Sequence, residues 1–298
     1  MSLSIRTAAL LAVLLALASC TRPDGADAPL RAIGAPQAPA GPDPGLLAAW
    51  ADFPVDRKPR PIVLIGEAVK VDGFTTGDAK LAFLKGSLSL EAALPPGPAT
   101  VRVRLHDGVF ELPAIGARAA YDRIAAVGRP DSAPDASPAP MRITKVELGT
   151  AQFHTDRGPL TLPAWLFTGP EMMGPLAVPA PGPAAFWRPD EPGYSGIGNG
   201  SIAADGVTLT VQLPQPQAAC PGQPVLRYQA EAVESGTAVT VGLRVVETLP
   251  PATPAAGGEC GSDLVLRSAP YTVRLAGPLG ARVLVLSSTG AAEVVRGG

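Results

Sequence analysis

Hydrophobic and polar residues alternate most regularly in the last hundred residues of the chain. Apolar side chains occupy every second position in three runs, 207–213, 226–232 and 239–245. This period of two is typical of strands that bury one face. Ser235-Gly236 predicts a hairpin turn between the second and third runs. Two more strands, 271–275 and 282–286, are expected to pair around Gly277-Pro278. The pattern predicts an antiparallel, sandwich-like β part over residues 193–298.

The region before it, residues 62–168, mixes strand and helix patterns. Residues 100–105 alternate between Val or Leu and Arg, and Asp107-Gly108 supplies a turn after them. Ala117 to Val127 places apolar residues at helical spacing and is followed by Gly128, which predicts one clear helix. Further short strands are expected at 62–65, 143–148, 151–154 and 160–167, and 78–85 fits a short helix capped by Asp78 or a strand. The fold class is therefore mainly β with a minor α+β N-terminal part.

Segments rich in Pro, Ala and Gly separate these regions. Residues 20–61 contain few large apolar side chains, which predicts a flexible stalk, although Leu46 to Trp50 fits a helical turn or a docking contact. Residues 169–192 predict a connector between the two folded parts. A single packed unit is the alternative, because only composition marks that boundary.

Residues 1–19 have the charge and the short apolar stretch of an export signal. The residues at its end, Leu17-Ala18-Ser19-Cys20, resemble the lipobox of bacterial lipoproteins. The resemblance implies cleavage before Cys20 and a diacylglyceryl group on its sulfur, which anchors the protein at the outer face of the cell membrane. Two acyl chains give durable attachment. An ordinary signal peptide followed by an incidental Cys is the alternative.

The charge gives no reason to expect nucleic acid as a partner. The formal net charge is −2, and it becomes −3 without residues 1–19, which contain one Arg and no acidic residue. No later stretch has the apolar length of a membrane span, so the lipid is the expected membrane contact.

Cys220 and Cys260 are the only cysteines besides Cys20. An even remainder in an exported chain predicts one disulfide between them, at the open end of a hairpin. Two free thiols or a metal pair are the alternatives, although structural zinc requires four ligands.

Two short segments carry a family resemblance: 155–159 with 162–165 (TDRGP and LPAW), and 276–283 (AGPLGARV). With the paired Cys220 and Cys260, they make the chain resemble uncharacterised secreted lipoproteins of high-GC Gram-positive bacteria. The resemblance extends over most of residues 60–290 and implies export and a shared fold. It transfers no catalytic residue, because the group has no assigned activity.

Candidate chemistry is sparse. His154 and Asp156 are two residues apart, and Ser195 between glycines is the one nucleophile that fits a hydrolase with them, but Ile197 replaces the last Gly of a nucleophile elbow. Asp156 fits turn chemistry more simply, by capping its own backbone. His106 is expected on a polar strand end. No calcium loop, phosphate-binding loop or dinucleotide fingerprint occurs, so no metal and no cofactor is expected.

The aromatic residues offer one binding hypothesis. Trp165, Phe186 and Trp187 would form a stacking platform if they were exposed together, whereas the alternative places Trp165 in the core and Trp187 as a loop plug. Three functions follow, in order of preference. The first is a non-catalytic surface module that binds a cell-envelope protein, the second is a binder of a small molecule or glycan through Trp165 and Trp187, and the third is a serine hydrolase. The sequence does not indicate an oligomeric state.

Overall fold

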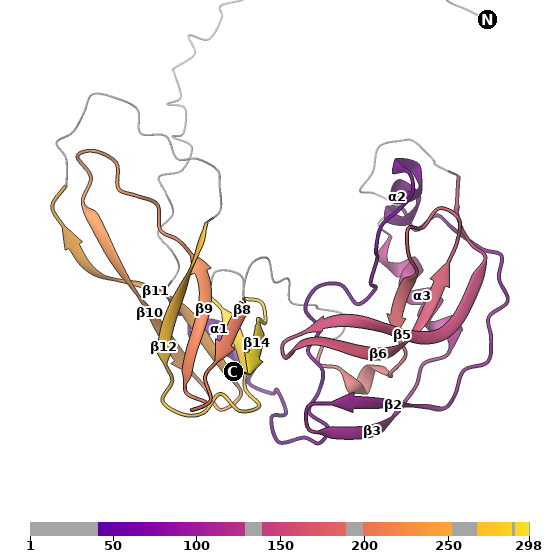
Figure 1. The fold of residues 1–298 in the computed structure, drawn as a ribbon, viewed down its shortest axis with the longest axis horizontal. Helices are drawn as coiled ribbons and strands as arrows, with labels where there is room; N and C mark the ends of the chain where they lie inside the picture. The colour runs from indigo at the N-terminus through magenta and orange to yellow at the C-terminus, as the bar shows by residue number, and fades with distance from the viewer. Residues whose placement is uncertain (1–40, 129–138, 189–198, 252–266, 288–289, 298) are drawn as a thin grey trace, which may run out of the picture. The chain divides into compact units, whose positions relative to one another are not determined.

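The computed structural model describes residues 41–128, 139–188, 199–251, 267–287 and 290–297 (Figure 1). Residues Ala38–Gly298 form one compact unit. Strands predominate and most strand pairs are antiparallel, which confirms the predicted mainly β fold with a small α+β part. No helix of the described residues combines the length and the apolar character that a membrane crossing requires.

The C-terminal part is a sandwich of two sheets with the strand orders β10-β11-β13 and β12-β9-β8-β14. Its strands are β8 (Asn199–Ile202), β9 (Thr208–Pro214), β10 (Val225–Glu234), β11 (Ala238–Leu249), β12 (Ser268–Arg274), β13 (Val283–Leu286) and β14 (Val294–Gly297). The predicted alternation holds in β9, where Leu209, Val211 and Leu213 are buried and the residues between them are half-buried. They pack against β11 residues such as Val239 and Val241, so the core lies between the two sheets.

The predicted pairing of the last two strands is wrong. β12 pairs with β9 and β13 pairs with β11, so the segment between them crosses from one sheet to the other. The glycines and proline from which a hairpin was predicted lie in this crossing connection. Gly280 has a φ of +52°, which favours glycine. β13 and β14 also pair in parallel with β11 and β8, so the sandwich is not purely antiparallel.

The α+β part is built on a three-stranded antiparallel sheet in the order β5-β6-β7. A hairpin, β2–β3, and a short parallel pair, β1–β4, accompany it. The strands are β1 (Leu88–Leu90), β2 (Thr100–Leu105), β3 (Gly108–Pro113), β4 (Met141–Ile143), β5 (Lys145–Thr155), β6 (Gly158–Thr168) and β7 (Leu176–Pro179), and the helices are α2 (Gly77–Leu84), α3 (Ala117–Val127) and the 3₁₀ turn η2 (Pro183–Ala185).

Helix α3 has the predicted bounds and buries Ala120 and Ile124 completely, while the ring of Tyr121 lies 6.4 Å from that of Phe167 on β6. Helix α2 also forms, but its N-cap is Thr76, whose hydroxyl accepts a hydrogen bond from the backbone N–H of Ala79. Asp78 therefore does not cap this helix. The cap lies two residues earlier because Thr76 has the extended backbone that an N-cap requires.

Residues 62–65 link the cores of the two parts. Ile62 and Leu64 belong to the core of the α+β part. Val63 belongs to a third apolar cluster, shared with Val283 and Val285 of β13. The segment makes only isolated bridges, to Phe186 and Thr155, instead of the predicted regular strand. Its alternating side chains nevertheless enter two cores, as the period of two requires.

The flexible stalk predicted for residues 20–61 is wrong for its described residues, 41–61, whereas the helical turn or docking contact expected at Leu46 to Trp50 is confirmed. Helix α1 (Gly45–Ala48) lies in this segment, and Leu47 and Phe53 are buried in the third cluster beside Ala238 and Ala292. The composition was misleading because a few large apolar residues are enough to dock a Pro-rich segment onto a sheet.

The connector predicted at 169–192 is also wrong for its described residues, 169–188. Strand β7 adds to β6, and Leu176, Val178 and Ala180 are fully buried in the core of the α+β part. Pro179 ends this short edge strand, a position where proline is tolerated. The Pro-rich stretch is therefore part of the fold.

Candidate functional site

The residues of the hydrolase hypothesis do not assemble in the described part of the chain. His154 is exposed near the end of β5, whereas Asp156 is buried and directs its carboxylate at Arg60. Ser195 lies outside the described residues. The structure therefore gives Asp156 a different partner from the one that a catalytic triad requires.

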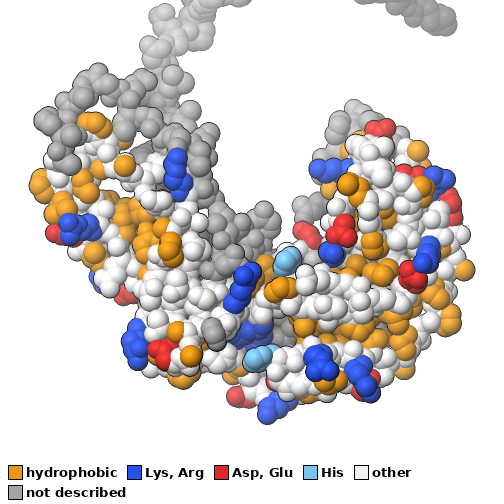
Figure 2. All heavy atoms as spheres, viewed as in Figure 1, with side chains coloured by type: hydrophobic (Ala, Val, Ile, Leu, Met, Phe, Trp, Pro, Cys, Tyr) orange, Lys and Arg blue, Asp and Glu red, His pale blue; other side chains and the backbone are white. Residues whose placement is uncertain are grey.

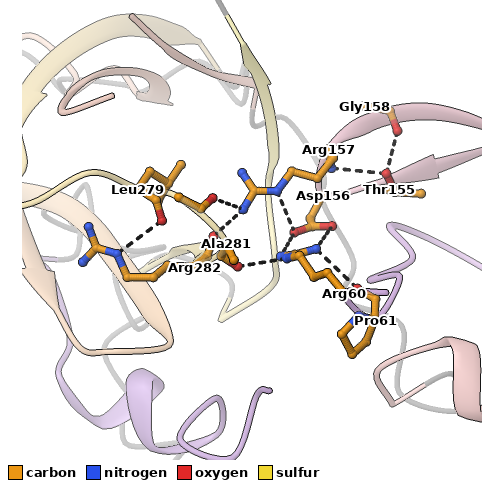
Figure 3. Close-up of polar contacts among 10 residues, drawn as sticks. Arg60, Pro61, Thr155, Asp156, Arg157, Gly158, Leu279, Ala281 and Arg282 are labelled. Atoms are coloured by element: carbon orange, nitrogen blue, oxygen red, sulfur yellow. Dashed lines mark hydrogen bonds and ion pairs between the residues drawn. The ribbon is translucent and has the colours of Figure 1, made fainter. Parts of the chain in front are cut away.

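Asp156 is the centre of an ion-pair network (Figure 3). Arg60 binds its carboxylate with two nitrogens, Nη2 to Oδ2 at 2.6 Å and Nη1 to Oδ1 at 3.2 Å. The side chain of Asp156 is 3% exposed and that of Arg60 is 15% exposed. A two-pronged, charge-assisted contact of this kind is among the strong hydrogen-bonding arrangements of proteins. We call Arg60, Asp156, Arg157 and their carbonyl acceptors the Asp156 network.

A second arginine, Arg157, approaches the same carboxylate, with Nε 3.7 Å from Oδ2. Burial lowers the pKa of Arg157, the carboxylate of Asp156 opposes this change, and the charge of Arg60 adds to it. The network thus holds two cations and one anion. Backbone carbonyls receive the remaining donors: Arg60 Nε donates to Ala281, and Arg157 Nη2 donates to Gly280 and Arg282.

The turn itself is stabilised by Thr155 rather than by Asp156. The Thr155 hydroxyl donates to the carbonyl of Gly158 at 2.7 Å and accepts from the backbone N–H of Arg157 at 3.2 Å. This corrects the expectation that Asp156 caps its own backbone. Its backbone instead donates to Val63 and accepts from Val295. The β5–β6 turn is thereby bonded to the segment 62–65 and to β14.

The network joins the two sequence segments that carry the family resemblance. One contains Asp156 and Arg157, and the other contains the carbonyl acceptors at 280–282. Within the second segment, Arg282 pairs with Glu234 at 2.7 Å and donates from Nη2 to the carbonyls of Gly277 and Pro278. These contacts give the polar residues of both segments a role in holding the fold together.

The aromatic platform predicted from Trp165, Phe186 and Trp187 is not formed. Trp165 is fully buried in β6 and its indole Nε1 donates to the carbonyl of Ile115 at 2.8 Å. Phe186 is buried in the core of the α+β part. Trp187 instead packs against the third cluster. The three rings are therefore not exposed together, and Trp165 is a core residue, as the alternative interpretation stated.

Trp187 has a different aromatic environment, which the sequence did not indicate. The ring of Phe53 lies edge-to-face with both Trp50 and Trp187, with centroid distances of 6.1 and 5.4 Å. A shallow pocket of about 210 Å³ lies beside them, lined mainly by Trp50, Val63, Leu64 and Trp187. The indole Nε1 of Trp187 is buried and has no hydrogen-bond partner among the described residues. The pocket is smaller than the roughly 300–1,000 Å³ of typical sites for drug-sized ligands, so it has room for a single ring.

Exposed apolar side chains gather at one end of the sandwich, as Figure 2 shows over β10 and β11. Leu226, Val245 and Val246 are 36%, 39% and 45% exposed. A register shift between Arg227 and Tyr228 leaves Val246 with no residue opposite it. We call residues 225–227 and 245–249 the open end of the β10–β11 hairpin. Contiguous exposed apolar side chains are typical of interaction surfaces.

The described ranges contain no group of three His, Cys, Asp or Glu side chains that could hold a metal ion. His106 is exposed in the β2–β3 turn. Cys220 lies in the loop before β10, and its predicted partner Cys260 lies outside the described residues, as does Cys20. The disulfide and the lipid attachment therefore stay predictions.

Comparison of the chain with models of known protein families, with curated proteins and with solved structures finds no match. The resemblance to secreted lipoproteins stays a prediction, and function is argued from the site.

Proposed function

We propose that this protein is exported, is held at the outer face of the cell membrane by lipid on Cys20, and binds a cell-envelope protein without catalysing a reaction. The export signal of residues 1–19 and the lipobox support the location. The single observation that carries the binding role is the exposed apolar open end of the β10–β11 hairpin. Apolar surface of this kind, on a rigid sheet, is suited to a protein partner.

The partner is tested by photocrosslinking in the native cells. A benzophenone amino acid replaces Val246 at the open end, and in a matched control it replaces Val109 of β3, which is 49% exposed. Crosslinks from position 246 to one envelope protein, absent from position 109, are the expected result. Failure of both positions to crosslink any protein would contradict the proposed binding function.

The anchor is tested by the intact mass of the protein purified from membranes. We expect the mass of residues 20–298 plus a diacylglyceryl group, lowered by two hydrogens until a reductant opens the Cys220–Cys260 disulfide. Cys20→Ser removes the lipid and should release the protein into the soluble fraction. An unmodified mass for residues 1–298 would contradict export, cleavage and lipidation together.

A binder of a small molecule is the second candidate, and the pocket beside Trp50 and Trp187 favours it. Trp165 no longer belongs to this hypothesis because it is buried. Binding of two probes, N-acetylglucosamine and benzoate, is measured by saturation-transfer NMR with the wild type and with Trp187→Leu. A signal with the wild type that Trp187→Leu loses supports a ligand site, and no signal from either probe removes this candidate.

The serine hydrolase remains the third proposal, and it depends on Ser195. A fluorophosphonate probe should label the wild type and not Ser195→Ala if this proposal holds. We expect no labelling, because Asp156 is already held by Arg60.

A further inference from the structure

Strand β10 is a long edge strand of its sheet, and the edge strand β12 of the facing sheet lies near it. In its sheet, β10 pairs with β11 alone, over all ten residues from Val225 to Glu234. Among the described residues no strand is hydrogen-bonded to its other side. An edge strand presents unpaired N–H and C=O groups to whatever approaches it.

The pairing shows which backbone groups these are. The N–H of Ser235 donates to the carbonyl of Ala238, so these two residues form a hydrogen-bonded pair of the ladder. The register then runs without a shift from Glu234 to Tyr228. Bonded and non-bonded pairs alternate in an antiparallel ladder. Tyr228, Ala230 and Ala232 therefore turn their N–H and C=O groups away from β11, while the residues between them bond to β11.

Other described edges are shorter or are protected. β12 carries Pro270, β7 ends at Pro179, and β13 and β14 have four residues each. β5 is long but begins with a lysine, and residues 63–65 bond to its far end. The second half of β11 is also an edge, but the bulge at Val246 interrupts its alternation. β10 has no proline, no lysine and no inserted residue, and its charged residues Arg227, Glu231 and Glu234 each form an ion pair within the chain.

We propose that β10 accepts an extended segment of the partner protein as an added β-strand. This inference rests on the proposed function and specifies its binding mode. Backbone hydrogen bonds to Tyr228, Ala230 and Ala232 would supply affinity, and alternate side chains would supply specificity. The incoming strand needs apolar residues on the side of Leu226 and Tyr228. On its other face it meets the cross-strand ion pairs of Arg227 with Glu247 and of Glu231 with Arg244, which favour polar residues of either sign.

The first experiment compares two substitutions of one residue in the full mature chain. Ala232→Pro removes an N–H that points away from β11 and blocks strand pairing, whereas Ala232→Val keeps this N–H and suits a strand. Crosslinking from position 246 to the partner should fall about tenfold in Ala232→Pro, as loss of a backbone bond and of close approach predicts, and stay within twofold in Ala232→Val.

The second experiment needs no substitution at the edge, so it holds even if Ala232→Pro fails to fold. Amide hydrogen exchange of the ¹⁵N-labelled protein is followed by NMR with and without the purified crosslinked partner. Binding should slow exchange at Tyr228, Ala230 and Ala232 by at least about tenfold and leave Gln229 and Glu231 nearly unchanged, because these already bond to β11.

Each other outcome is distinct. A partner that crosslinks from position 246 without alternating protection binds side chains, and this overturns strand addition while the proposed function stands. A partner captured only from position 109 overturns strand addition and also overturns the open end as the binding surface. A crosslink to a second copy of this chain shows edge-to-edge pairing of two copies and also overturns the inference. No crosslink from either position removes both proposals.

Discussion

Asp156 illustrates how one buried charge is made tolerable. A carboxylate removed from water loses hydration energy that only close, well-oriented donors replace. Arg60 supplies two such donors. Other N–H groups of Arg60 and Arg157, which do not bind the carboxylate, donate to backbone carbonyls of the 276–283 segment. Two arginines and one aspartate leave one net positive charge, and the dipoles of the carbonyl groups stabilise it. Removing the carboxylate should therefore do more damage than removing an exposed partner.

Asp156→Asn should lower the free energy of unfolding by about 3–5 kcal/mol, because it leaves the Arg60 charge buried without its counter-ion. Urea unfolding of the two proteins measures the difference. The control is Arg102→Ala, which breaks the exposed pair with Glu111 and should cost less than about 1 kcal/mol. Equal effects of the two substitutions would contradict the structural role of the network.

The sequence contained only part of this information. It singled out Asp156 because it lies near a histidine and precedes Arg157-Gly158, but its ion-pair partner Arg60 lies 96 residues away between two prolines. No local pattern marks such a residue. Phe53 was missed for the same reason, since its docking surface is made by strands near the end of the chain.

Single strands and helices were predictable from the chain because their signals are local. The alternation of β2 and β9 and the helical spacing of α3 gave the right elements with nearly the right bounds. Which strands pair with one another was harder to predict from the sequence. The β10–β11 hairpin was right, but β12 and β13 lie in different sheets, and the strands expected at 143–148 and 151–154 are one strand, β5. A Gly/Pro-rich connection can form a hairpin or cross a sandwich, and only contacts with distant strands decide between them.

The β8–β9 turn yields a pH prediction. The Thr208 hydroxyl and the backbone N–H groups of Thr208 and Val207 all donate to Asp205, which lowers its pKa to about 2. Because the folded pKa lies below the unfolded value, the stabilisation is fully present above roughly pH 4 and is lost as the pH falls toward about 2.

Asp205→Asn should therefore be less stable than the wild type at pH 7, and the difference should shrink between about pH 4 and pH 2. Thermal unfolding at several pH values checks this. Thr210→Ser, on β9 outside the turn, serves as a control with no such pH dependence. A constant difference across the range would contradict the role of the ionised carboxylate.

At the scale of the whole unit, Ala38–Gly298, segments from both ends of the described chain share one cluster. Leu47 and Phe53 pack with Val283, Val285 and Ala292, and Val63 joins them. The composition of residues 20–61 predicted too little apolar surface to fold. The described part of this segment, residues 41–61, packs because residues of the sandwich complete its apolar cluster. Composition cannot reveal a surface that another part of the chain provides.

Phe53→Ala should lower the free energy of unfolding by about 3–5 kcal/mol, because it removes a ring that is 2% exposed and that two indoles and Arg60 contact. Phe53→Leu fills most of the space and should cost much less. Urea unfolding followed by circular dichroism checks both. An unchanged midpoint for Phe53→Ala would show that residues 43–61 do not contribute to the folded unit.

The shared cluster also sets an order of events during biosynthesis. Asp43 and Ser287, which are hydrogen-bonded, stand 244 residues apart. A ribosome that adds about 5–20 residues per second needs more than about ten seconds to make that interval. Until β13 and the residues after it emerge, Phe53 and Leu47 lack the part of their cluster that Val283, Val285 and Ala292 supply. The nascent chain therefore leaves its first apolar anchors partly uncovered until its last strands are made, which makes it a natural client for chaperones that prevent aggregation.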